Sequence, residues 1–202
     1  MTFEEYLDSR KMHLVVTLFY NDGIYKNIFP LLKHLGIKIF DWIKKIYNFR
    51  HSEFNQLVDD FIAETKYELW DDRKALEELT RNEENIKEFI SGDRGSNLIF
   101  KYKIKAISQH YQSLHEISLS TLKSLLEENG KEQYLEILEE ILRYSTKKME
   151  NLFLENAIIK DSFLYDIESF LKEEDFDSFE SYKTHGSINI QFFHTAEQQK
   201  MI

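Results

Sequence analysis

Apolar residues recur every three or four positions along most of this chain, the spacing that places them on one face of an α-helix. Thr2 and Glu5 match a capping box, so a helix is expected over residues 3–20, before the turn residues 21–23. The same periodicity predicts further helices over residues 24–35, 37–47, 52–90 (weakly broken), 98–115, 118–128, 131–156 and 163–171. We therefore expect a mainly α fold, a multi-helix domain that resembles a bundle.

Turn-forming residues separate these helices. Pro30 is expected to kink or divide the second helix, because proline lacks the N–H group that a helix interior uses. Gly36 suits the left-handed conformation that ends a helix, and Asn129 with Gly130 offers a similar stop between the two members of a predicted helical hairpin. Two glycines flanked by Ser, Asp and Asn make residues 91–97 the clearest interior loop.

One segment follows a different pattern. Over residues 187–193, two isoleucines alternate with polar residues before two phenylalanines, which predicts a minor β-strand near the C-terminus. A lone strand needs a partner, and the sequence does not locate one. The acidic run over residues 173–177 is the nearest thing to a domain boundary. We expect a helical domain over residues 1–172, with an acidic turn, short strand and tail over residues 173–202 packed on the same domain.

The composition agrees with long helices around a core. Sixteen Phe and eleven Tyr stand against one Pro and six Gly, and 42% of the 202 residues are apolar. The net charge of −10 argues against a nucleic-acid-binding face. No apolar run approaches the ~20 residues of a membrane-spanning helix, and the N-terminus lacks the pattern of a signal peptide. We expect a cytoplasmic protein that binds neither nucleic acid nor membrane.

The chain contains no cysteine. A disulfide, a thiolate nucleophile, a cysteine zinc site and a cysteine-ligated iron–sulfur cluster are therefore excluded within it. His110 and His115 are five residues apart, a spacing that does not place both rings on one helical face, so no metal site is predicted. Paired acids such as Glu139 and Glu140 are expected on solvated faces, and no catalytic residue is predicted.

The first predicted helix carries polar residues that are candidates for contact with a substrate or another domain. Arg10 and His13 lie one helical turn apart and can jointly contact an anionic or polar group. A capped surface face with a partly buried histidine explains the same spacing. Tyr20, Asn21 and Asp22 can present polar groups at the end of this helix, although such residues are also ordinary turn formers.

The loop over residues 92–97 is a second candidate contact region. Gly92, Gly95 and Asn97 precede a predicted helix, whose backbone N–H groups can cradle a phosphate, and Arg94 adds positive charge. The loop lacks the lysine and the spacing of a P-loop, and glycines at a helix junction need no ligand to explain them. The same loop can instead dock against another domain.

Three parts of the chain, in order, carry a resemblance to a known family. The first comprises residues 8–14 (DSRKMHL), 18–23 (LFYNDG) and 35–42 (LGIKIFDW), and the later two are residues 92–102 (GDRGSNLIFKY) and 190–202 (IQFFHTAEQQKMI). In this order they resemble the region that follows the barrel in cobalamin-binding radical S-adenosylmethionine proteins. The resemblance spans nearly the whole chain, although the helices between these stretches are not diagnostic.

The resemblance implies a fragment of a larger enzyme. In the family, upstream regions bind cobalamin and hold an iron–sulfur cluster through a CxxxCxxC motif, and S-adenosylmethionine serves radical chemistry, often methyl transfer. This chain has no cysteine, no Gly-rich loop after a strand and no DxHxxG motif. The resemblance therefore implies a C-terminal accessory helical region that supports substrate binding or the active-site fold and does not catalyse alone. Its partners would be the upstream radical and cobalamin domains, in the same chain or in a partner subunit.

Two other classes of function fit the same residues. The lack of catalytic residues and the aromatic stripes are also typical of a stand-alone helical protein-interaction module. In a small-molecule binding protein, the face with Arg10 and His13 and the loop over residues 92–97 would line one pocket.

Overall fold

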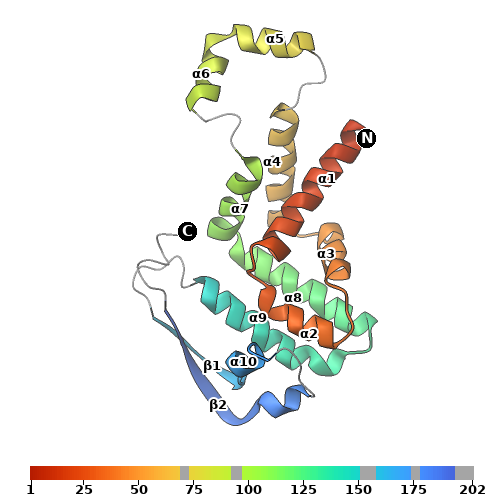
Figure 1. The fold of residues 1–202 in the computed structure, drawn as a ribbon, viewed down its shortest axis with the longest axis vertical. Helices are drawn as coiled ribbons and strands as arrows, with labels where there is room; N and C mark the ends of the chain where they lie inside the picture. Colours follow the sequence, from red (N-terminus) through yellow and green to blue (C-terminus); the bar gives the residue numbers. More distant parts are fainter. Residues whose placement is uncertain (69–72, 92–96, 151–157, 174–177, 194–202) are drawn as a thin grey trace. The chain divides into compact units, whose positions relative to one another are not determined.

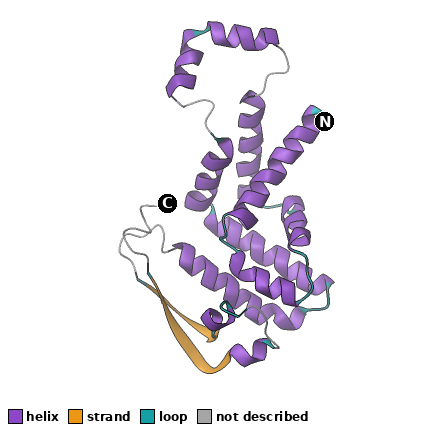
Figure 2. Cartoon of the chain, viewed as in Figure 1, coloured by secondary structure: helices purple, strands orange, loops and turns teal. Residues whose placement is uncertain are grey.

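The computed structural model describes residues 1–68, 73–91, 97–150, 158–173 and 178–193. Of the residues that the structure describes, 75% are helical, and a small antiparallel sheet lies near the C-terminus (Figure 1 and Figure 2). The predicted mainly α fold with a minor strand segment is thus confirmed. The chain divides into two compact units: unit 1 contains Met1–Asn21 and Arg50–Leu114, and unit 2 contains Asp22–Phe49 and His115–Ile202.

Unit 1 is helical throughout its described part. Its elements are α1 (Phe3–Val16), the π-helical turn η1 (Thr17–Asn21), α4 (Ser52–Glu68), α5 (Arg73–Arg81), α6 (Glu83–Ser91) and α7 (Leu98–Gln109). The predicted capping box is present, since the Thr2 hydroxyl accepts from the Glu5 N–H and the Glu5 carboxylate accepts from the Thr2 N–H at 2.7 Å. The α-helix itself ends at Val16, earlier than predicted, because the last turn widens into η1.

The core of unit 1 is aromatic and lies among α1, α4 and α7. Phe19 of η1 meets Phe54 of α4 edge to face, with the ring centroids 5.9 Å apart. Farther along α4, Phe61 packs in the same manner on Tyr102 of α7, at 5.3 Å. Edge-to-face pairs of buried rings contribute stabilisation beyond the area they bury. The apolar face of α4, with Phe54 and Phe61, therefore forms the centre of this unit.

Unit 2 holds the remaining elements. They are η2 (Lys26–Ile28), α2 (Phe29–His34), α3 (Ile39–Asn48), most of α8 (Tyr111–Glu128), η3 (Glu132–Tyr134), α9 (Leu135–Glu150), β1 (Ile159–Tyr165), α10 (Ile167–Phe170), η5 (Phe179–Tyr182) and β2 (Lys183–Phe192). Both predicted glycine stops are left-handed, with φ of +71° at Gly36 and +61° at Gly130. Pro30 stands in the first turn of α2, where no N–H is needed, and so it divides the predicted second helix.

Buried hydrogen bonds join the helices of unit 2. The Trp42 Nε1–H of α3 donates to the Thr121 hydroxyl of α8 at 3.0 Å. The Asn27 amide of η2 donates to the Ser145 hydroxyl of α9 at 3.1 Å. Tyr25 stacks edge to face on Trp42, and burial raises the pKa of its phenol. Each polar group is paired, as a buried group must be to avoid a desolvation penalty.

The helix predicted over residues 163–171 is wrong in its first part. Residues up to Tyr165 form β1, which pairs antiparallel with β2 and is the partner that the sequence did not locate. Only the short helix α10 follows, and Asp166 caps it by accepting from the Ser169 N–H at 3.0 Å. Apolar positions in this segment fit both periods, and the pairing with β2, which lies far along the chain, decided between them.

Other helix boundaries also differ from the predictions. The sequence predicts helices over residues 98–115 and 118–128, but the break between the observed helices α7 and α8 lies at His110. His110 adopts a non-helical conformation without any Gly or Pro nearby. The predicted long helix after Ser52 is divided into α4, α5 and α6. The helix predicted over residues 131–156 begins as a 3-10 turn, and its end lies outside the described residues.

The predicted boundary at residue 173 stays a prediction. The sheet combines a strand from each side of it, since β1 precedes residue 173 and β2 follows it. None of the helices in the described residues has the length and apolar character needed to cross a membrane.

Candidate functional site

The two candidate residues of α1 have different surroundings. The Arg10 guanidinium lies over the Phe61 ring, 5.4 Å from its centroid, and its Nε is buried without a hydrogen-bond partner in the described part of the chain. His13 is exposed. Arg10 thus packs against the aromatic core of unit 1, where a cation over a ring face is favourable. His13 is the member of the pair that solvent reaches.

The candidate residues at the end of the first helix lie on a π-helical turn. Tyr20 is 47% exposed and Asn21 is exposed, both in η1 of unit 1. Asp22, the next residue, belongs to unit 2. Of the second region, Asn97 caps α7 by accepting from the Phe100 N–H at 3.2 Å.

The other candidates of that loop, Gly92, Arg94 and Gly95, lie outside the described residues. The idea that the loop and the Arg10/His13 face line one pocket therefore stays a prediction.

A polar groove lies between α4 and α7 within unit 1. We name it the α4–α7 groove. It has a volume of about 580 Å³ and is lined by Ser52, Glu53, Gln56, Leu57, Asp60, Lys105, Gln109 and His110.

The charges in the α4–α7 groove are paired with one another. Asp60 accepts from the Gln56 amide at 2.8 Å and from the Lys105 ammonium at 3.2 Å, and these hydrogen bonds lower the pKa of its carboxyl group. Glu53 accepts from the Ser113 hydroxyl and lies 3.9 Å from Nδ1 of His110. The serine hydroxyl thus donates to a carboxylate and not to the imidazole, so these three residues do not form a serine–histidine relay.

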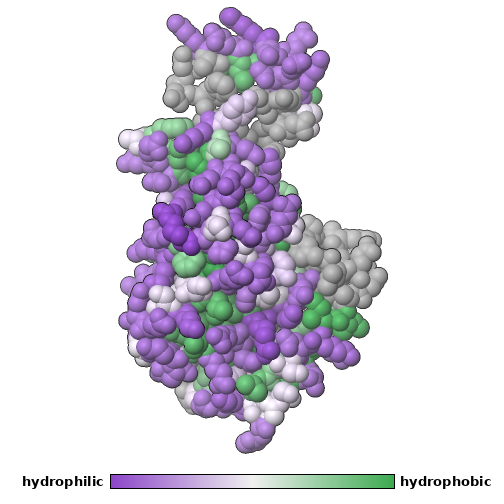
Figure 3. Space-filling view, turned by 180° about the vertical axis from the view of Figure 1, so that it is seen from behind, coloured by the Kyte–Doolittle hydropathy of each residue, from purple (hydrophilic) through white to green (hydrophobic). Residues whose placement is uncertain are grey.

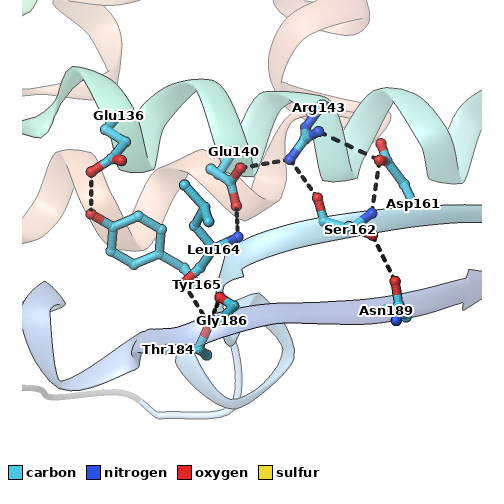
Figure 4. Close-up of polar contacts among 10 residues, drawn as sticks. All are labelled: Glu136, Glu140, Arg143, Asp161, Ser162, Leu164, Tyr165, Thr184, Gly186 and Asn189. Atoms are coloured by element: carbon cyan, nitrogen blue, oxygen red, sulfur yellow. Dashed lines mark hydrogen bonds and ion pairs between the residues drawn. The ribbon is translucent and has the colours of Figure 1, made fainter.

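A cluster of residues in unit 2 joins α9 to β1, and we name its members, Glu140, Arg143, Asp161, Ser162 and Leu164, the α9–β1 cluster (Figure 4). Glu140 is only 8% exposed, and its carboxylate accepts from the Leu164 N–H at 2.7 Å and from Arg143. The Arg143 guanidinium also donates to the Ser162 carbonyl at 2.9 Å and lies 3.4 Å from Asp161.

The α9–β1 cluster compensates an irregularity of the sheet. The regular register ends at Phe163 and resumes at Tyr165, so Leu164 faces residues 184–187 of β2 without a regular partner. Glu140 binds its N–H, and the Thr184 hydroxyl donates to its carbonyl at 3.1 Å. Two side chains therefore satisfy the backbone N–H and carbonyl of Leu164 at this irregularity.

One turn before Glu140, Glu136 extends the contact between α9 and the sheet. It accepts from Lys183 at 2.7 Å and from the Tyr165 hydroxyl at 2.9 Å, and these hydrogen bonds lower the pKa of its carboxyl group. Burial, with the hydrogen bond to Glu136, raises the pKa of Tyr165. These groups anchor both strands on one helix.

The expectation that Glu139 and Glu140 both face solvent is wrong for Glu140. Glu139 is exposed, but Glu140 is buried in the same stripe of α9 as Ile137 and Tyr144. The signal was present in the sequence, because residues three and four apart share a helical face. A charged residue inside an apolar stripe, three positions before an arginine, indicates a buried carboxylate with a cationic partner on the same helix.

A second open groove, in unit 2, lies between α3 and α8. It has a volume of about 510 Å³, and Lys45 pairs across it with Glu128 at 2.6 Å. The hydrogen bond from Lys45 lowers the pKa of the Glu128 carboxyl group. Here too the opposite charges in contact neutralise each other.

The described residues bring together no three His, Asp or Glu side chains that could hold a metal ion. His110 lies near Glu53, and Nδ1 of His115 lies 2.6 Å from the Thr146 hydroxyl. Comparison of the chain with family models, curated proteins and solved structures found no match.

Proposed function

We propose that this chain is the C-terminal accessory helical region of a cobalamin-binding radical S-adenosylmethionine enzyme, which supports substrate binding or the active-site fold and does not catalyse alone. The observation that carries the proposal is the resemblance of residues 8–42, 92–102 and 190–202, which follow one another in the order of that family.

The polar groups of the described residues are used mainly for structural contacts, which favours an accessory role without catalysis. The buried donors and acceptors of Trp42, Asn27 and Glu140 join elements of unit 2 to one another. In the α4–α7 groove, Asp60 and Lys105 neutralise each other. A catalytic acid or base needs a group poised to exchange a proton with a substrate, and these groups are engaged in structural pairs.

Each resembling stretch also presents exposed side chains that another domain can contact. His13 and Asn21 are exposed in the first stretch, and Tyr20 is 47% exposed. Asn97 is exposed at the start of α7 in the second. In the third, Phe193 is 68% exposed. Aromatic side chains of this kind are enriched in interfaces between domains.

The cofactors would be held elsewhere in the parent enzyme. Because the chain has no cysteine, the ligands of an iron–sulfur cluster must come from other segments. The sites for cobalamin and S-adenosylmethionine would likewise belong to the upstream domains, which are the proposed partners.

The coding frame upstream of Met1 provides the first test. A frame that continues through a cobalamin-binding segment and a CxxxCxxC motif is the expected result. A start at Met1, with no neighbouring gene for such domains, would contradict the proposal.

A second test uses the full-length enzyme, in which this chain is joined to the upstream radical and cobalamin domains. Tyr20→Ala is expected to lower cleavage of S-adenosylmethionine or binding of cobalamin, because it removes an exposed contact residue of the first stretch. Tyr67→Ala is the matched control, since Tyr67 is an equally exposed aromatic residue (56%) outside the three stretches. Equal effects of both variants would argue against a specific contact at Tyr20.

A stand-alone helical protein-interaction module is the second candidate function. The observation in its favour is the exposure of large apolar side chains in unit 1, with Ile90 81% exposed and Phe100 56% exposed. Exposed apolar groups of this size are typical of surfaces that bind other proteins. A native start at Met1 would favour this function over the first.

A further inference from the structure

Positive charge is concentrated in one part of unit 2, the three consecutive elements η2, α2 and α3. Residues 24–49, which contain these elements, include five lysines and a single acid, Asp41, whereas the whole chain has 26 basic and 36 acidic residues. The chain is therefore acidic, with a net charge of −10, and this segment has the opposite sign. An asymmetry of this kind points to electrostatic attraction of a partner.

The packing of these elements turns most of the lysines toward solvent. The three elements bury apolar side chains such as Leu31 and Trp42, and four lysines are left exposed, namely Lys26, Lys33, Lys38 and Lys44. Because α2 packs against both η2 and α3, the four lysines lie on neighbouring elements. We name them the α2–α3 basic surface.

Most of this charge is not neutralised by the rest of the described chain. Lys44 lies 3.8 Å from Asp41. Within the described ranges, no acidic side chain lies at ion-pair distance from Lys26, Lys33 or Lys38. Lys105 of the α4–α7 groove, by contrast, is paired with an acid. The basic surface therefore keeps a net positive charge.

We infer that the α2–α3 basic surface binds an acidic surface of another protein, through ion pairs between its lysines and the partner's Asp and Glu side chains. Charge complementarity selects this occupant. Since the whole chain carries a net charge of −10, an acidic partner is attracted here and repelled by most of the remaining surface. The same charges therefore set the orientation in which the partner approaches.

The extent of the surface favours a protein over a nucleic acid or a membrane. A nucleic acid is a long polyanion, which would continue past these four lysines onto a surface of net negative charge. Membrane binding needs apolar side chains that insert, and Trp42, Ile43 and Ile46 of α3 are buried inside unit 2. An acidic patch on a folded protein matches both the sign and the limited size of the surface.

The shape beside Lys44 also suits a protein partner. Lys44 and Phe49 line the groove of about 510 Å³ between α3 and α8, which can receive side chains of a partner. Phe40, under the Lys44 ammonium, is 56% exposed, and aromatic residues are enriched in protein interfaces. Seen from behind, most of the described surface is hydrophilic (Figure 3), so the sign of the charge and not hydropathy distinguishes this surface.

Fluorescence anisotropy with a labelled peptide of ten glutamates tests the inference. The unchanged chain is expected to bind this peptide, with an affinity that falls as salt is added. The combined substitution of Lys33→Glu and Lys38→Glu reverses two charges of the surface and should weaken binding about tenfold.

The combined substitution of Lys160→Glu and Lys172→Glu is the matched control. It changes the net charge by the same amount at two exposed lysines of unit 2, one on β1 and one after α10, outside the basic surface. It should change the affinity by about twofold or less, because these lysines do not contact the peptide. Circular dichroism checks the fold of both variants.

Three results would overturn the inference. The first is no binding of the peptide by the unchanged chain, even at low salt. The second is equal weakening in both variants, which would mean that net charge and not this surface controls binding. The third is tighter binding of a ten-nucleotide single-stranded DNA, or of vesicles that contain phosphatidylserine, than of the peptide, because the surface would then belong to a nucleic acid or a membrane.

Discussion

The α9–β1 cluster of unit 2 and the α4–α7 groove of unit 1 use the same kinds of residue, yet water reaches them to different extents. The Glu140 side chain is 10% exposed in the cluster, whereas the Asp60 and Glu53 side chains in the groove are 39% and 62% exposed. When a partner is lost, water can replace it in the groove but not at Glu140. Burial, and not the number of charged contacts, therefore decides which cluster stabilises the fold.

The largest expected effect follows from removing the buried carboxylate of the α9–β1 cluster. Glu140→Ala removes the acceptor of the Leu164 N–H and one of the acceptors of Arg143, so we expect a loss of about 3 kcal/mol in the free energy of unfolding. Chemical denaturation measures it. Glu139→Ala, at the exposed neighbouring position, should cost about 0.5 kcal/mol or less. Similar losses in both variants would remove the distinction drawn between the two clusters.

A neutral buried pair should rank second. Thr121→Val keeps the shape of the side chain but leaves the buried Trp42 N–H without an acceptor, which should cost about 1–3 kcal/mol. The same denaturation experiment measures it, with Ser120→Ala at the exposed neighbouring position as the control. A change near zero would mean that water enters the core of unit 2 to replace the hydroxyl.

The pH dependence of stability extends the comparison to a titrating group. Burial lowers the pKa of His115 below its ordinary value of 6.5, so the unfolded chain binds this proton more readily than the folded chain. Stability should therefore be lost as the pH falls through 6.5 toward the lower folded pKa, with no contribution from this group at higher pH.

Denaturation midpoints on both sides of that window measure the effect. His115→Gln should flatten this part of the profile because the titrating group is gone. An unchanged slope in the variant would assign the pH dependence to other groups.

The smallest effect is expected in the α4–α7 groove. A double-mutant cycle on Asp60 and Lys105, which lie 3.2 Å apart, should give a coupling below about 1 kcal/mol that declines with added salt. The same cycle on Glu140 and Arg143 should give a larger value that salt changes less. A coupling between Asp60 and Lys105 as large as that between Glu140 and Arg143 would indicate that the α4–α7 groove excludes water.

Local signals predicted several features of the fold. Thr2 and Glu5 marked the start of α1 because a capping box involves only residues three apart. Gly36 and Gly130 marked helix ends because their positive φ values suit glycine. The break at His110 was missed, since its neighbours carry no sequence signal for a helix end.

The candidate site was predicted less completely than the fold. The spacing of Arg10 and His13 was read correctly as one helical turn, but the packing of Arg10 on Phe61 depends on α4, far along the chain. The adjacent acids Glu139 and Glu140 together predict a solvated face, whereas the position of Glu140 in the apolar stripe of α9 buries it. No local pattern indicates that Leu164 needs a side-chain acceptor.

The sequence by itself determined the mainly α class, the caps and stops of the early helices and the presence of a strand near the C-terminus. Those features depend on contacts between residues a few positions apart, which composition and periodicity record. Only the tertiary structure decided that residues 159–165 form a strand, that Glu140 is buried and that β1 is the strand with which β2 pairs. Each of these depends on segments brought together by folding, where burial and pairing outweigh local preference.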